Sequence, residues 1–173
     1  MSRYTVANLP RITREELAEA IRAKNPGVSV IDVRDNDFVG GHILGCQNVP
    51  VNTHDYRIPE LVRTLKKQDT VVFHCALSQQ RGPSSALRYL RERERMAEKG
   101  ELGIADDGGD LKQRVCVLEG GFVKWQEMCV DLLLFCFCAG SSLSFHVLTR
   151  GYSYGEDTQL TEGYAKDLWD DKW

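Results

Sequence analysis

Residues 74–83 read His-Cys-Ala-Leu-Ser-Gln-Gln-Arg-Gly-Pro, and this stretch decides the fold. It follows the β-branched and aromatic run Thr70–Phe73, which is typical of a buried strand. It leads into residues 83–90, where a proline in the first turn favours the start of a helix. The sequence therefore predicts a strand that ends at Cys75, a loop of five residues, and a helix that begins near Arg81.

The predicted loop has the composition of an oxyanion-binding site around a nucleophilic sulfur. Its backbone N–H groups can converge on one point, where the helix N-terminus adds positive potential that favours a thiolate and a bound anion. A thiolate at Cys75 would attack phosphorus or arsenic, and the Arg81 guanidinium can donate two parallel hydrogen bonds to the oxyanion. We therefore predict Cys75 and Arg81 as catalytic residues and expect His74 to shape the loop. The predicted oxyanion-binding positions are Ala76, Leu77, Ser78, Gln79, Gln80 and Gly82.

A simpler interpretation makes Cys75 a buried structural thiol and Arg81 a surface charge. The spacing of the two residues does not by itself exclude this. The preceding strand, the helix start and the Gly82-Pro83 pair together favour the anion-binding loop.

Strands alternate with helices along much of the chain. The capping-box pattern of Thr13–Glu16 predicts a helix that stops near Pro26-Gly27, and a second helix is predicted from Pro59 to Leu65. Core strands are predicted over Val28–Val33 and Arg114–Leu118. This alternation predicts an α/β fold with a largely parallel sheet covered on both faces. The reactive loop then lies at the carboxyl end of a strand, where such sheets bind ligands.

Three further motifs resemble the rhodanese superfamily. Val30–Asp35 and Gly41–Pro50 are similar to its two signature segments, and Val117–Trp125 is similar to its last strand and following helix. The resemblance covers residues 5–126 and resumes near Tyr154. It implies a three-layer rhodanese-like α/β fold with a central, mostly parallel five-stranded sheet and helices on both faces. It also implies one catalytic domain over residues 1–173.

The loop length resembles one branch of that superfamily. Its sulfurtransferases have four residues between Cys and Arg, whereas its dual-specificity cell-cycle phosphatases and small eukaryotic arsenate reductases have five, as here. The resemblance implies a cysteine-dependent protein-tyrosine or dual-specificity phosphatase that acts through a phosphocysteine. The alternative is an arsenate reductase that uses glutathione and glutaredoxin. A sulfurtransferase and a catalytically silent binding module are the less favoured interpretations.

The chain departs from the large cell-cycle phosphatases at two places. Those enzymes have acidic residues in the loop where this chain has Ala76 and Gln80, and a protective cysteine at the position of Val33. These differences argue against activation of cyclin-dependent kinases and against protection by that disulfide. Cys46 is interpreted as a packing residue, with a resolving thiol for Cys75 as the alternative.

The sequence assigns no general acid. Asp35 and Asp37 follow the predicted strand over residues 28–33, and Glu119 follows the strand over residues 114–118. We interpret each of them as an ordinary solvated or capping carboxylate.

Composition and charge limit the possible partners. The net charge is −3 with basic and acidic residues interspersed, which argues against nucleic-acid or membrane partners. The six cysteines lack paired spacing, so neither a metal site nor a disulfide framework is predicted. The N-terminus does not read as a signal peptide, and a catalytic thiol suits the reducing cytoplasm or nucleus. A phosphatase of this kind needs no cofactor, and its substrate is a phosphoprotein or a small oxyanion.

Residues 128–153 form an apolar insertion that breaks the family pattern. A bilayer span needs about 20 apolar residues, and Asp131 and His146 interrupt this one. We prefer a translated, retained intron, because the codons of Met128-Cys129-Val130 can supply a splice donor and those of Tyr152-Ser153 an acceptor in the same phase. Transcript sequencing would test this, and genomic DNA without those splice dinucleotides would exclude it.

Overall fold

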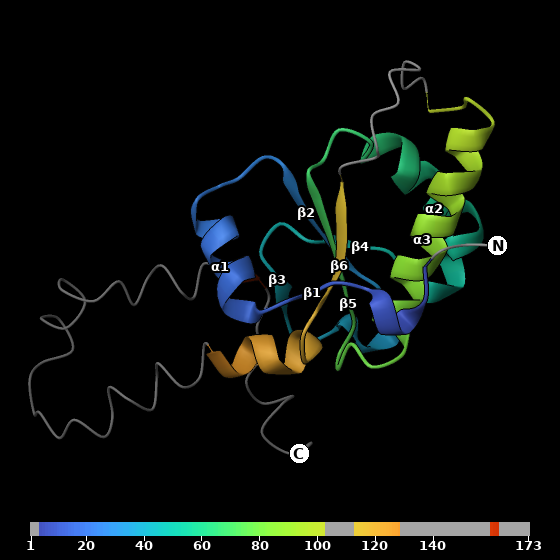
Figure 1. Cartoon of the computed structure of the whole chain (residues 1–173). Helices are drawn as coiled ribbons and strands as arrows, with labels where there is room; N and C mark the ends of the chain where they lie inside the picture. Colours follow the sequence, from blue (N-terminus) through green and yellow to red (C-terminus); the bar gives the residue numbers. More distant parts are fainter. Residues whose placement is uncertain (1–3, 103–112, 129–159, 163–173) are drawn as a thin grey trace, which may run out of the picture.

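The structure is a computed structural model that describes residues 4–102, 113–128 and 160–162 (Figure 1). Most of the insertion over residues 128–153 lies outside the described residues, and only Met128 is described, at the end of a helix over residues 121–128. No helix among the described residues is long and apolar enough to cross a membrane.

The strands are β1 (Arg11–Ile12), β2 (Val28–Asp32), β3 (His42–Ile43), β4 (Gln47–Asn48), β5 (Thr70–His74), β6 (Arg114–Leu118) and β7 (Thr161–Glu162). The labelled helices are α1 (Arg14–Arg22), α2 (His54–Thr64) and α3 (Arg81–Glu98), with short 3-10 turns η1 (Val6–Asn8), η2 (Asn36–Phe38) and η3 (Val51–Thr53).

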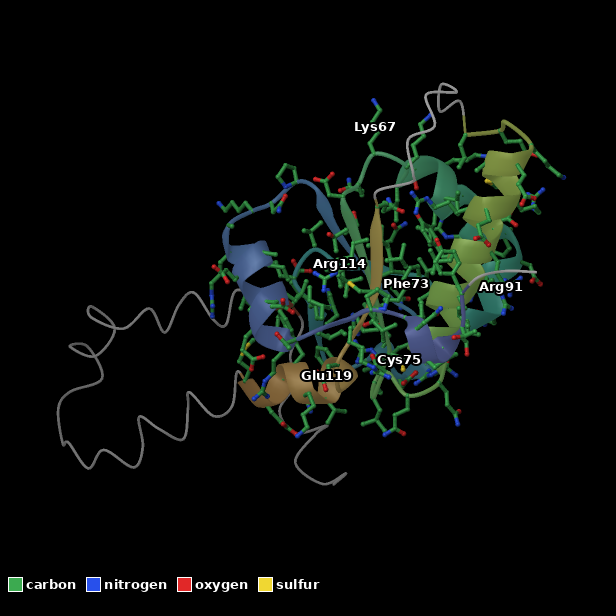
Figure 2. All side chains as sticks on the ribbon, in the orientation of Figure 1. Lys67, Phe73, Cys75, Arg91, Arg114 and Glu119 are labelled. Carbon is green, nitrogen blue, oxygen red and sulfur yellow. The ribbon has the colours of Figure 1, made fainter. Side chains whose placement is uncertain are left out.

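The central sheet has five strands in the order β1-β6-β5-β2-β4, and all of its pairings are parallel. The predicted rhodanese-like α/β fold is therefore confirmed. β5 is central, with Ile31 of β2 opposite Phe73 on one side and Val117 of β6 opposite it on the other. Because the strands are parallel, the segments that follow β2, β5 and β6 meet at one edge of the sheet. Figure 2 shows Cys75 and Glu119 at that edge, where β5 and β6 end.

Helices cover both faces of the sheet, as predicted. In Figure 1, α2 and α3 lie on one side, and α1 and the helix over residues 121–128 lie on the other. Side chains alternate along β5, so Phe73 is buried in the core under α2 and α3 and Val72 in the opposite core with Leu17 and Trp125. Both faces of β5 are thus apolar, which explains its continuous hydrophobic run.

The sequence predicted the start of α1 correctly but not the start of α2. Thr13 makes the predicted capping box of α1, with its hydroxyl accepting from the Glu16 amide at 3.2 Å. α2 begins at His54 rather than at Pro59, so the predicted start was wrong. The turn η3 leads the chain into α2, and Pro59 lies inside the helix, where it offers no N–H to the carbonyl of the exposed Asp55.

A buried ion pair lies where β2 ends. The side chains of Asp32 and Arg34 are both fully buried, and Arg34 Nε and Nη2 donate to Asp32 at 2.9 and 2.7 Å. Arg34 Nη2 also donates to the Gly41 carbonyl at 2.7 Å, and Nη1 donates to the Asp37 carbonyl at 3.2 Å. The guanidinium carbon lies 4.2 Å from the ring centroid of Phe122. One side chain therefore links β2, the segment around η2 and the helix over residues 121–128.

Residues 160–162 contribute to the same fold. β7 pairs with β3 in an antiparallel two-stranded sheet. The Leu160 side chain is buried in the core under α1, and Trp125 Nε1 donates to the Thr161 hydroxyl at 3.2 Å. These contacts attach the residues beyond the insertion to the helix over residues 121–128.

We predict that Arg34→Met lowers the free energy of unfolding by about 3–5 kcal/mol, because it leaves the Asp32 carboxylate buried without its partner. Urea denaturation measures this change. The control is Arg57→Met, which removes the partly exposed pair of Arg57 with Glu60 and should cost less than about 1 kcal/mol. Equal costs for the two variants would contradict the role given to the buried pair.

Candidate active site

The loop after β5 folds back over the sulfur of Cys75. Ser78 adopts a left-handed backbone conformation, with φ of 53°, which reverses the chain. Its amide donates to Cys75 Sγ at 3.2 Å, and its hydroxyl accepts from the Cys75 amide at 3.4 Å. Cys75 is 4% exposed and Ser78 is buried, so the sulfur lies at the base of the loop.

Two helix N-termini support this loop. α3 begins at Arg81 and places Pro83 in its first turn, as predicted. The helix over residues 121–128 contributes the Phe122 amide, which donates to the Cys75 carbonyl at 2.9 Å, and the Val123 amide, which donates to the Ala76 carbonyl at 3.0 Å. Because N–H and C=O point in opposite directions across a trans peptide, these bonds turn the next two loop amides away from that helix.

Gly121 makes this support possible. Its φ is +62°, and a Cβ there would lie 2.6 Å from the Cys75 carbonyl oxygen and closer still to that of Ala76. The backbone of the loop therefore rests directly on the backbone at Gly121. Gly121 lies in Val117–Trp125, the segment similar to the family's last strand and following helix, and its close approach to the loop gives this glycine a steric basis.

His74 points to the opposite face of the sheet from Cys75. It is fully buried, Nδ1 lies 3.3 Å from the Cys75 carbonyl oxygen, and Nε2 lies 3.6 Å from Asp32 Oδ2 without a hydrogen-bond partner. Burial lowers the pKa of His74, so the ring is neutral near pH 7. With its proton on Nδ1, His74 donates to the loop backbone, which fits its predicted loop-shaping position.

Arg81 is held at the rim of the loop by two carboxylates. Its Nη1 and Nη2 donate to the two oxygens of Asp37 at 2.7 and 2.5 Å, and Nη1 also donates to Asp35 at 3.3 Å. The bidentate pair lowers the pKa of Asp37 and raises the pKa of Arg81. Asp37 is exposed and Asp35 is the N-cap residue of η2, as interpreted, but both carboxylates also pair with Arg81, which was not predicted from the sequence. The available signal was their position after β2, which neighbours β5 in a parallel sheet.

Cys46 lies on the other side of the sheet from Cys75. It packs against the core under α1, with its sulfur near Asp32 and His74, whereas Cys75 belongs to the core under α2 and α3. Burial, with the Asp32 charge, raises the pKa of Cys46 to about 12. Both observations favour the packing interpretation over a resolving thiol, and Cys46 and Cys75 are free of disulfides.

Asp32, Cys46 and His74 form a candidate metal-ligand cluster, with ligand atoms within 4.8 Å of one another. Arg34 already donates to both carboxylate oxygens of Asp32. This cation competes with a metal ion for Asp32 and opposes it by charge. Asp32 therefore serves the ion pair.

A groove of about 510 Å³ runs beside the outer side of the loop. Leu77, Ser78 and Gln79 form one wall, and the opposite wall includes Arg11 and Lys124. Glu119, exposed at the end of β6, also lines it. The groove is much larger than an inorganic oxyanion, and it reaches the loop at Leu77, Ser78 and Gln79 rather than at Cys75 or Arg81.

Comparisons with known proteins agree with this geometry. The family profile described as "Rhodanese-like domain" matches residues 13–128. The chain is similar to "Arsenate reductase 2.2" of Oryza sativa, with 38% identity over 104 residues that cover 60% of this chain and 72% of that protein. It is also similar to "CDC25-like phosphatase YCH1" of Saccharomyces cerevisiae, with 30% identity over 185 residues that cover 98% of this chain and 99% of that protein.

A solved structure extends the likeness to three dimensions. The crystal structure of Saccharomyces cerevisiae Ygr203w, described as a homolog of single-domain rhodanese and the Cdc25 phosphatase catalytic domain, has a TM-score of 0.60 and 28% identity. The match covers 99% of this chain and 98% of that one.

We predict that Gly121→Ala is more destabilising than Gly45→Ala, although both glycines have nearly the same positive φ. Gly45 has no atom within 4 Å of an added Cβ, so its substitution costs only the left-handed strain of about 1–2 kcal/mol. At Gly121 the clash with the loop carbonyls adds about 1–3 kcal/mol. Urea denaturation of the two variants measures the difference. Equal costs would show that the loop does not rest on Gly121.

Proposed function

Since this chain belongs to the rhodanese-like domain family, we propose that it is a cysteine-dependent dual-specificity or protein-tyrosine phosphatase. Its homologues include phosphatases and arsenate reductases of the same family. The observation that carries the proposal is the five-residue loop that buries Cys75, gives its sulfur the Ser78 amide and ends at Arg81. A loop of this length would surround a tetrahedral oxyanion. The groove beside Leu77 would hold the rest of a phosphoprotein substrate.

In the proposed reaction the Cys75 thiolate attacks the phosphorus atom of a phosphate monoester. The sulfur–phosphorus bond forms as the bond from phosphorus to the leaving oxygen breaks, and that oxygen takes a proton and leaves as an alcohol or phenol. Water then attacks the phosphocysteine, which releases inorganic phosphate and restores the thiolate. The loop amides and Arg81 would stabilise the charge that spreads over the equatorial oxygens in both steps.

Arsenate reduction is the second candidate, and the similarity to the rice arsenate reductase supports it. Arsenate has nearly the shape and charge of phosphate, so the same loop would accept it. Here Cys75 would form a sulfur–arsenic bond as one arsenic–oxygen bond breaks and its oxygen leaves as water. An external thiol such as glutathione would then attack the Cys75 sulfur, so that arsenite leaves with the bonding electron pair and a mixed disulfide remains, which glutaredoxin with a second thiol would reduce. The phosphatase reaction needs no such reductant. A cytoplasmic or nuclear location would suit both reactions.

We predict that the purified chain hydrolyses an aryl phosphate such as p-nitrophenyl phosphate, and that Cys75→Ser abolishes turnover because serine is not ionised at neutral pH. Release of p-nitrophenol measures the rate. Cys116→Ser is the matched control, because it changes a buried sulfur on the neighbouring strand β6. Hydrolysis that survives Cys75→Ser would contradict the proposal. No hydrolysis by folded protein, together with glutathione-dependent arsenate reduction, would favour the second candidate.

A further inference from the structure

We propose that Asp37 is a positioning residue, which holds the Arg81 guanidinium so that one pair of its N–H groups faces the substrate oxyanion. This inference rests on the proposed function, because it concerns the oxyanion that Cys75 would attack. It gives a role to a carboxylate that neither forms a bond nor transfers a proton in the proposed reaction.

The hydrogen-bond geometry of Arg81 supports this assignment. A guanidinium has five N–H donors: two on each terminal nitrogen and one on Nε. Asp37 accepts from Nη1 and Nη2, which form the end-on pair, and Asp35 accepts from Nη1 again. Nε–H and the second Nη2–H remain, and neither donates a hydrogen bond to any of the residues that the structure describes. These two N–H groups are parallel and match two oxygens of a phosphate-like anion.

Asp37 is itself fixed from the core of the domain. Its Oδ1 accepts from the Asp35 amide at 3.0 Å, and its carbonyl accepts from Nη1 of the buried Arg34 at 3.2 Å. A chain of hydrogen bonds therefore connects Arg34 to the backbone of Asp37, and the Asp37 carboxylate to Arg81. An arginine held in this way needs no search through its rotamers when the anion binds.

The charge of Asp37 distinguishes positioning from two other roles. Arg81 lowers the pKa of Asp37, so the carboxylate is ionised at neutral pH and has no proton to give to a leaving group. A carboxylate that only blocked Arg81 would compete with the anion, and its removal would strengthen anion binding. A positioning carboxylate instead raises the rate of the chemical step, because the aligned N–H pair acts where charge develops in the transition state.

The test is Asp37→Asn, assayed with p-nitrophenyl phosphate and with inorganic phosphate as a competitive inhibitor. We expect kcat to fall by about 10- to 100-fold, while the inhibition constant for phosphate changes much less. Asp37→Glu, which keeps the charge and the fork of two oxygens, should recover part of kcat. Unchanged or higher kcat in Asp37→Asn, or tighter phosphate binding without loss of rate, would overturn the inference.

The matched control is Asp55→Asn. Asp55 pairs with Arg88, which lies two turns along α3 from Arg81, and its exposed side chain lies away from the Cys75 loop. This variant also removes one carboxylate from an arginine of α3, and we expect its kcat to equal that of the wild type. Thermal melting of all variants excludes unfolding as the cause of a lower rate.

A second measurement keeps the inference testable if the wild-type chain hydrolyses no aryl phosphate. Iodoacetate is an anion and iodoacetamide is neutral. The alkylation rate of Cys75 by iodoacetate, divided by its rate with iodoacetamide, therefore reports how strongly the loop favours an anionic reagent. Peptide mass spectrometry measures both rates. We expect Asp37→Asn to lower this ratio because Arg81 is no longer held toward the loop. A ratio equal to or above that of the wild type would overturn the inference, whatever the natural substrate.

Discussion

The buried pair of Asp32 and Arg34 is the interaction on which the arrangement of the site depends. Removing two charges from water is costly, and the hydrogen bonds of Arg34 to Asp32 and to two backbone carbonyls offset that cost. Arg34 reaches Asp32, the carbonyls of Asp37 and Gly41, and the face of Phe122. Phe122 in turn donates its amide to the Cys75 carbonyl. The same side chain thus orders the segment that holds Arg81 and the helix that supports the loop.

Backbone hydrogen bonds hold the rest of the site in place. The loop carbonyls are held by the amides of residues 122 and 123, and Ser78 turns the chain back so that its amide meets the sulfur. Such a site recognises charge and tetrahedral shape rather than the identity of the central atom. This explains why phosphatases and arsenate reductases occur together among the homologues. Under the proposed function, discrimination between substrates would fall to the groove beside Leu77 and to the supply of an external thiol.

Local patterns were sufficient to predict the sheet and the loop. The β-branched run before Cys75, the capping box at Thr13 and Pro83 in the first turn of α3 each act within a few residues, and each was found in the structure. The pairing of Arg81 with Asp37 could not be read in the same way, because it joins residues 44 positions apart. It depends on β2 lying beside β5. The sequence implied a parallel sheet, but no local pattern indicated that these two side chains meet. The same holds for Cys46, whose sheet face is set by the register of β4 with β2.

The most direct test of this account is a crystal structure of the Cys75→Ser variant with bound tungstate, a tetrahedral dianion. The account predicts the anion above residue 75, in contact with the loop amides and with Nε–H and Nη2–H of Arg81, while Asp37 keeps its end-on contact with the same guanidinium. A bound anion that displaces Arg81 from Asp37, or that lies outside the loop, would contradict it.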